Sequence, residues 1–137
     1  MANSSLARMA AGIFGAVYAL VGVLGFLPFL GGSYSLDPHN LLGLFAVNVV
    51  HNVVHLAVGL GGLAAYAGGE AQSVMFARTV GVVYALLAVL GIFAGSGNFL
   101  GLVPIGGLDI GLHAVTAAVL LYVGFAAPRR ERDGAVA

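Results

Sequence analysis

The chain has 137 residues, of which 61% are hydrophobic and only 7% are charged, and its mean hydropathy is +1.06. Because a soluble domain usually carries about 25% charged residues, this composition excludes a soluble globular protein and predicts a single-domain integral membrane protein. A formal net charge of zero offers no basic surface for nucleic acid, and the absence of Cys excludes disulfides and zinc sites built on Cys.

Four apolar stretches follow one another along the chain, each near the roughly 20 residues that a helix needs to cross a bilayer. They predict an all-α, four-helix membrane domain over residues 11–127, with spans at 11–30, 42–66, 77–95 and 108–127. The first stretch is longer than the apolar core of a signal peptide, about 7–15 residues, so we expect a retained span. Residues 1–10 are expected to form a cytoplasmic N-terminus and residues 128–137 a disordered cytoplasmic tail.

The basic residues predict the orientation of these spans. The loops at 31–41 and 96–107 contain no Lys or Arg, whereas every Arg falls before span 1, at the connector where span 3 begins, or after span 4. With four spans, these three segments lie on one side of the membrane, and the positive-inside rule assigns that side to the cytoplasm. We therefore expect a multi-pass protein of the cell membrane with both termini cytoplasmic. The residues concerned are Arg8, Arg78, Arg129, Arg130 and Arg132.

An internal repeat relates spans 1 and 3. The segment GAVYALVGVLG (15–25) resembles GVVYALLAVLG (81–91), and Tyr18 aligns with Tyr84. Spans 2 and 4 align more weakly, through a pair of polar residues four positions apart. This repeat predicts two similar helical hairpins in the same orientation, which would place spans 2 and 4 parallel to each other.

Span 2 carries polar and small residues at intervals of three and four, which is the spacing of one stripe along a helix. Unpaired polar side chains cost several kcal/mol each in hydrocarbon, so the stripe is expected to face the interior of the bundle. The small residues would let helices approach closely. The stripe comprises Asn48, His51, Asn52, His55, Gly59 and Gly62.

Counting residues at about 1.5 Å of helix rise each gives the polar residues of span 2 candidate partners on span 4. His55 and His113 fall in one layer near the middle of the membrane, and His51 and Asp109 fall one turn further from the cytoplasm. The predicted site is the cluster of Asn48, His51, Asn52, His55, Asp109 and His113, with Tyr18 and Tyr84 as candidate outer contacts.

Several functions could use such a cluster. The first is a structural hydrogen-bond network that fixes helix register in a helix-packing or accessory protein. The second is a transition-metal site formed by three imidazoles and one carboxylate, with His51, His55, Asp109 and His113 as the possible ligands. Haem b held between two facing His is a third, and a proton relay or a small polar or quinone-like ligand is a fourth.

The sequence does not favour an enzyme, because the Ser residues lie at the termini and in loops and form no Ser-His-Asp arrangement. The expected partners are the lipid bilayer and another membrane protein or a second copy of this chain, packed through Gly-rich helix faces. Nucleic acid is not expected.

With these residues in view, the chain resembles a known family. The run LLGLFAVNVVHNVVHLAVGLGGL (41–63) is similar to the signature of the bacterial domain-of-unknown-function family 4383, which comprises small four-span membrane proteins. The opening GAVYALVGVLGFLP and the closing LDIGLHAV (108–115) follow the order of motifs in that family. The resemblance covers nearly the whole chain. It implies the fold, the membrane location and the six polar positions of the cluster, but no activity, because none is established for the family.

Overall fold

The computed structural model of the chain describes residues 5–94 and 98–127, so the expected tail at 128–137 and the first residues of the chain lie outside the described part. The described residues contain four helices long and apolar enough to cross a membrane, and the predicted four-helix fold is confirmed. These helices are α1 (Leu6–Leu24), α2 (Val49–Gly68), α3 (Glu70–Ala94) and α4 (Leu108–Leu121), and a π-helical turn, η2 (Tyr122–Ala126), continues α4.

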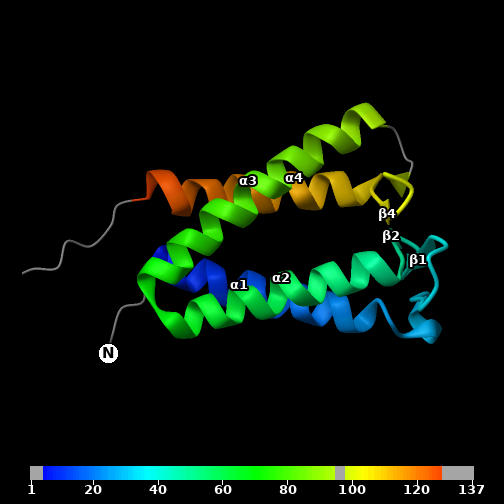
Figure 1. Cartoon of the computed structure of the whole chain (residues 1–137), viewed down its shortest axis with the longest axis horizontal. Helices are drawn as coiled ribbons and strands as arrows, with labels where there is room; N and C mark the ends of the chain where they lie inside the picture. The colour runs from blue at the N-terminus through cyan, green and yellow to red at the C-terminus, as the bar shows by residue number, and fades with distance from the viewer. Residues whose placement is uncertain (1–4, 95–97, 128–137) are drawn as a thin grey trace, which may run out of the picture.

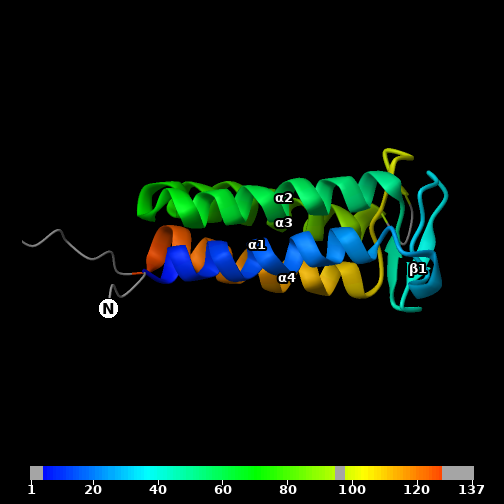
Figure 2. The same ribbon diagram turned by 90° about the horizontal axis from the view of Figure 1, so that it is seen from below.

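The helices form two hairpins with the same orientation, as the internal repeat predicted. α1 packs along α2, and α3 packs along α4. α1 begins at the end of the bundle where α4 ends (Figure 1), and the view at 90° shows α1, α2 and α4 running along the long axis of the bundle (Figure 2). We call the end with Leu6 and Ala126 the terminal end, and the opposite end, which carries the strands, the strand end.

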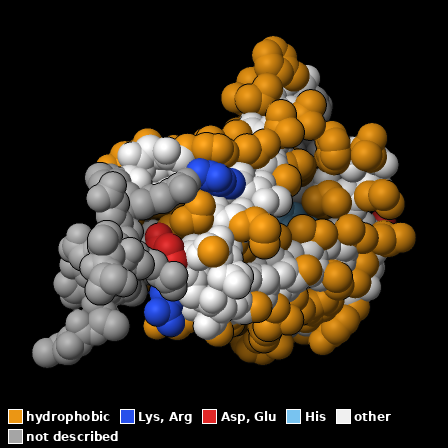
Figure 3. All heavy atoms as spheres, turned by 60° about the vertical axis from the view of Figure 1, so that its left-hand side comes forward, with side chains coloured by type: hydrophobic (Ala, Val, Ile, Leu, Met, Phe, Trp, Pro, Cys, Tyr) orange, Lys and Arg blue, Asp and Glu red, His pale blue; other side chains and the backbone are white. Residues whose placement is uncertain are grey.

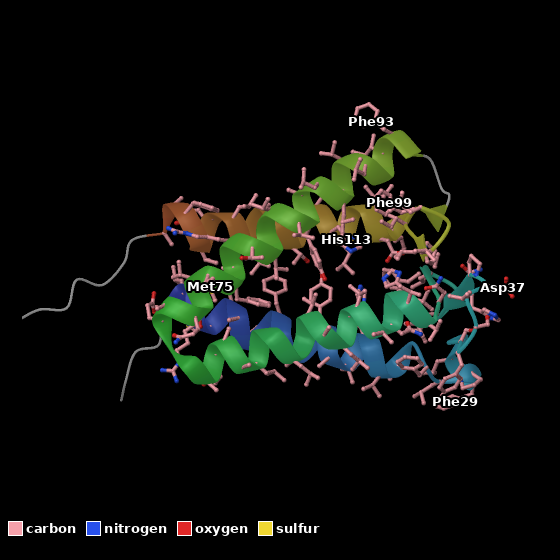
Figure 4. All side chains as sticks on the ribbon, in the orientation of Figure 1. Phe29, Asp37, Met75, Phe93, Phe99 and His113 are labelled. Carbon is pink, nitrogen blue, oxygen red and sulfur yellow. The ribbon has the colours of Figure 1, made fainter. Side chains whose placement is uncertain are left out.

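α3 crosses the bundle obliquely (Figure 1). Near the terminal end, Ala77 of α3 packs with Ala10 and Leu120 in a small apolar core. Toward the strand end, α3 diverges from the other helices, and Phe93 points away from the bundle with 83% of its surface exposed (Figure 4). The bundle is therefore closed at the terminal end and more open at the strand end.

The first two helices begin and end elsewhere than the apolar stretches predicted. Instead of spanning 11–30, α1 begins at Leu6, because the hydroxyl of Ser5 caps its first turn by accepting from the backbone N–H of Arg8 at 3.1 Å. It ends at Leu24, and the next segment is a short 3₁₀ turn, η1 (Pro28–Leu30). The predicted span at 42–66 includes an extended strand, and α2 begins only after Asn48, which caps it.

The connection between α2 and α3 is far shorter than the interval 67–76 that separates the predicted spans at 42–66 and 77–95. Gly69 alone separates the two helices, with a φ of 99° that L side chains rarely adopt. The hydroxyl of Ser73 donates to the carbonyl oxygen of Ala65 at 3.0 Å, tying the start of α3 to the end of α2. Most of the segment expected as a loop is therefore the first turn of α3.

Each helical hairpin carries a small antiparallel β-hairpin at the strand end. β1 (His39–Leu41) pairs with β2 (Phe45–Val47), and β3 (Asn98–Phe99) pairs with β4 (Val103–Pro104). Both turns have the sequence Leu-Gly with positive φ at the two residues, 53° and 71° at Leu42 and Gly43 and 54° and 71° at Leu100 and Gly101. The two outer loops thus repeat each other in conformation as well as in sequence.

Glycines bring α1 and α2 into backbone contact. A Cβ added at Gly15 would lie 2.6 Å from the backbone nitrogen of Leu63, and one at Gly22 would lie 2.7 Å from that of Leu56. A Cβ added at Gly62 would lie 2.8 Å from the Cα of Gly15. Glycines of both helices thus face each other within the first hairpin, where they let α1 and α2 approach closely.

An Arg closes each hairpin at the terminal end. Nε of Arg8 donates to the carbonyl oxygen of Tyr66 at 3.0 Å, and Nε of Arg78 donates to that of Gly124 at 2.8 Å. Each guanidinium also lies over an aromatic ring, that of Tyr66 or that of Phe125, at 5.0 and 4.8 Å from the centroid. The last carbonyls of α2 and of η2 are thereby satisfied by cations, which favour the negative end of a helix.

Candidate functional site

The two Asn of the polar stripe bind the chain's own loops. Asn48 accepts from the backbone N–H of His51, and its amide nitrogen donates to the carbonyl oxygens of Leu36 at 3.0 Å and Leu102 at 2.7 Å. One buried side chain therefore begins α2 and holds both outer loops.

Asn52 lies one turn further along α2 and holds the segment that follows the end of α1. Its amide donates to the carbonyl oxygen of Gly25 at 2.6 Å and to that of Ser33 at 3.2 Å. Position 25 has room only for Gly, because the Asn52 amide occupies the space that a Cβ would need.

The two His of α2 form a hydrogen-bonded pair. Nδ1 of His51 lies 3.2 Å from the carbonyl oxygen of Pro104, and its Nε2 lies 2.9 Å from Nε2 of His55. Because a carbonyl oxygen only accepts, Nδ1 of His51 carries the proton, and with both rings neutral His55 must donate from Nε2. Nδ1 of His55 is then an acceptor.

α4 brings Asp109 and His113 to the same region. Nδ1 of His113 donates to the backbone oxygen of Asp109 at 2.7 Å, and the Asp109 carboxylate faces the backbone N–H of Ala46 in β2. The ring of His113 lies 6.4 Å from that of His55 between centroids, and it is directed from α4 into the space between the hairpins (Figure 4).

The contacts between the two helical hairpins are reciprocal. α2 contacts β4 of the second hairpin, where His51 reaches the carbonyl oxygen of Pro104, and α4, which begins beside Asp109, contacts β2 of the first. β2 and β4 are the second strands of the two β-hairpins. Two hairpins related by an approximate two-fold axis would make such contacts, as in membrane proteins built from parallel repeats.

A tyrosine layer lies directly below the His, toward the terminal end. The rings of Tyr18 and His55 meet edge to face at 5.1 Å, and those of Tyr84 and His113 at 4.8 Å. The two Tyr contact each other at 5.3 Å, and the hydroxyls of Tyr18 and Thr116 are hydrogen-bonded at 2.9 Å. Equivalent residues of the two hairpins thus contact equivalent neighbours.

The two hairpins differ in the hydrogen bonds of their equivalent polar side chains. Among the described residues, three buried side-chain polar atoms have no hydrogen-bond partner: Nδ1 of His55, the hydroxyl of Tyr84 and Oδ2 of Asp109. Buried polar atoms are nearly always paired, so each of these is a candidate contact for a molecule bound between the helices.

Two cavities of similar size flank the His pair. The α1–α4 cavity has a volume of about 200 Å³, and its polar lining consists of Tyr18, His51, His55, Asp109 and Thr116. The α2–α3 cavity has a volume of about 190 Å³, and its polar lining consists of His51, His55, Tyr84 and His113. Hydrophobic side chains dominate the molecular surface, and part of a His is visible between them (Figure 3).

The model of the family described as Domain of unknown function (DUF4383) matches residues 8–126. The chain belongs to this family. A comparison with curated proteins found no match, and a comparison with solved structures found none either. The resemblance seen in the sequence is confirmed, and DUF4383 membership carries no activity with it.

The six cluster residues predicted for this DUF4383 protein are all buried, but two of the expected pairings differ in detail. Within the described chain, no hydrogen bond joins His51 to Asp109, since His51 bonds Pro104 and His55 instead. His55 and His113 do lie in one layer, though their rings are separated by 6.4 Å between centroids.

The geometry does not favour a metal or haem. In residues 5–94 and 98–127, no group of three or more His, Asp or Glu side chains is placed to hold a metal ion. The cavities of about 200 and 190 Å³ are smaller than the roughly 300–1,000 Å³ of a pocket for a drug-sized molecule. A haem macrocycle is larger still and does not fit between His55 and His113 in this arrangement.

Sequence reasoning missed the backbone partners in the DUF4383 chain. Leu36, Leu102 and Pro104 contribute carbonyl oxygens, which leave no trace in residue type. One signal was available: Asn40-Leu-Leu-Gly-Leu44 recurs as Asn98-Phe-Leu-Gly-Leu102, which extends the repeat through the outer loops and would have predicted two matching turns.

Proposed function

We propose that this protein is a multi-pass protein of the cell membrane whose polar cluster is a structural network, in a helix-packing or accessory role. The observation that carries the proposal is the identity of the hydrogen-bond partners of these polar side chains. Asn48, His51 and Asn52 bond backbone carbonyls in the loops between α1 and α2 and between α3 and α4. Polar side chains that bond the loops of their own chain fix helix register and loop position.

The proposed orientation places the terminal end in the cytoplasm. Arg8 and Arg78 lie at that end, and acidic and basic side chains gather there in the space-filling view (Figure 3). The positive-inside rule supports cytoplasmic termini. The strand end, with its two β-hairpins, then faces the outer side.

An accessory role implies a membrane partner. The glycines of the α1–α2 interface are used within the chain, but Gly61 and Gly111 have open space where a Cβ would stand. A second copy or another membrane protein packing through small residues would therefore use these two positions. Cross-linking of single-Cys variants there in native membranes tests this part of the proposal.

The structural role is tested by changing Asn52→Leu, which removes two donors but keeps a similar volume. The carbonyl of Ser33 would lose the partner that Asn52 supplies, and that of Gly25 would keep only the backbone N–H of Ser33, so we expect a loss of about 1–2 kcal/mol in the free energy of unfolding. Asn40→Leu is the matched control, because Asn40 is exposed in β1. Equal stability of the two variants in detergent micelles would reject the network as a structural element.

A further inference from the structure

The α1–α4 cavity contains a polar group that the structural network does not use. Asp109 is 1% exposed and lines this cavity, and within the described residues its Oδ2 has no hydrogen-bond partner. His55 lines the same cavity, and its Nδ1 is also unpartnered. Two residues that each carry an unpaired buried polar atom thus line one cavity.

The chemistry of these atoms selects a hydroxyl group. An ionised carboxylate only accepts hydrogen bonds, whereas a protonated carboxyl group also donates one. A hydroxyl donates and accepts, so it pairs with Asp109 in either protonation state. When Asp109 is protonated and donates to the hydroxyl, the proton of the hydroxyl is free to bond Nδ1 of a neutral His55.

The size and lining of the cavity select an aromatic ring as the body of the ligand. A cavity of about 150 Å³ lined by Leu, Ile and Phe accommodates benzene, and the volume of about 200 Å³ here adds room for a substituent. Apart from its polar end, the lining is aliphatic and aromatic, with Phe14 and Phe45 among the walls.

The cavity opens sideways, toward lipid. Val17 of α1 and Leu42 of the β1–β2 turn belong to its lining and are 46% and 56% exposed. A molecule dissolved in the bilayer can therefore enter between α1 and α4 without crossing the polar loops. A tail on the ring would leave by the same opening.

We propose that the α1–α4 cavity binds a phenol-class ring from the bilayer, with the ring hydroxyl on the Asp109 carboxyl group and the ring between α1 and α4. The site goes beyond the structural network, because neither Oδ2 of Asp109 nor Nδ1 of His55 takes part in the bonds that hold the loops.

The test titrates 4-methylphenol into protein in lipid nanodiscs, with toluene as the control molecule of similar shape. Resonances of ¹⁵N-labelled His rings report occupancy directly, since three His border the two cavities. We expect a saturable shift with 4-methylphenol and about a tenfold weaker effect of toluene at equal membrane concentration, the factor that one hydrogen bond contributes.

Two matched variants locate the site. Val21→Phe fills the α1–α4 cavity, and Leu87→Phe fills the α2–α3 cavity at the equivalent repeat position. We expect Val21→Phe to weaken 4-methylphenol binding by about tenfold or more and Leu87→Phe to leave it unchanged. Asp109→Leu should abolish the preference for 4-methylphenol over toluene.

The outcomes are distinct. Three results would overturn the proposal. The first is the absence of a saturable shift, which would indicate a cavity that holds water only. The others are equal shifts with 4-methylphenol and toluene, and a loss of 4-methylphenol binding in Leu87→Phe but not in Val21→Phe. A parallel titration with 4-dodecylphenol separates the sources: tighter binding than 4-methylphenol identifies a tailed membrane lipid, and equal binding identifies a free phenol. The stability of Asn52→Leu can fail its own test without affecting these results.

Discussion

Gly15 offers a direct test of the contact between α1 and α2. A Cβ at this position would lie 2.6 Å from the backbone nitrogen of Leu63 and 2.8 Å from the carbonyl carbon of Gly62. Both atoms belong to helix backbone and cannot rotate away. Restoring an ordinary contact of about 3.4 Å would require α1 and α2 to separate by about 0.8 Å.

The expected cost of Gly15→Ala follows from two opposing effects. Overpacking of a close contact costs about 1–3 kcal/mol, and replacing a helical Gly by Ala returns about 0.5–1 kcal/mol. We expect a net loss of about 1–2 kcal/mol. Gly61→Ala is the control, because it lies on α2 with nothing within 4 Å of the added Cβ, so only the favourable effect applies.

Equilibrium unfolding of the two variants by sodium dodecyl sulfate in mixed micelles, followed by circular dichroism, measures the difference. We expect Gly61→Ala to be the more stable by about 2 kcal/mol. If Gly15→Ala matched Gly61→Ala, the backbones of α1 and α2 would not approach as closely as described, and the glycines of this interface would have no steric role.

Three further predictions use the same unfolding assay or simple spectroscopy. Tyr18→Phe should lower the free energy of unfolding by about 0.5–1.5 kcal/mol, because it leaves the hydroxyl of Thr116 without its partner. Tyr84→Phe should not lower it, because the Tyr84 hydroxyl has no hydrogen-bond partner within the described chain. A larger loss in Tyr84→Phe than in Tyr18→Phe would contradict the hydrogen bonding of this layer. Leu100→Asn should raise stability by about 1 kcal/mol, because Leu at a φ of 54° is strained and Asn tolerates that conformation, and a loss would show that the exposed Leu anchors the turn in lipid. Elemental analysis and absorption spectroscopy of purified protein should find neither stoichiometric metal nor a Soret band, and a Soret band lost on His55→Ala would reverse our assessment of haem.

Much of the fold could be predicted from the sequence, because four apolar stretches and one aligned Tyr pair determine the number and pairing of the helices. The start of α2 could not. Residues 42–47 are apolar and fit the pattern of a helical span, since Leu42 gives no sign of the positive φ that turns the chain there. Asn48 is the N-cap that a helix start requires, but the apolar run before it concealed this role.

The candidate site was partly predictable for a different reason. Intervals of three and four residues identify the face of α2 and the layer of each His, because helix geometry is regular. They do not determine the rotation of a side chain, and His51 turns toward His55 on its own helix and toward Pro104 in β4. Partners that are backbone carbonyls in irregular segments cannot be identified from residue type.

The exchange of contacts between the two hairpins has a consequence for how the protein is made. α1 and α2 leave the ribosome first and can associate through their glycines at once. Asn48 and His51, however, find Leu102 and Pro104 only after the second hairpin has been synthesised. Until then these polar side chains face lipid or water without those partners, so we expect the nascent first hairpin to depend on the insertion machinery until α4 is released.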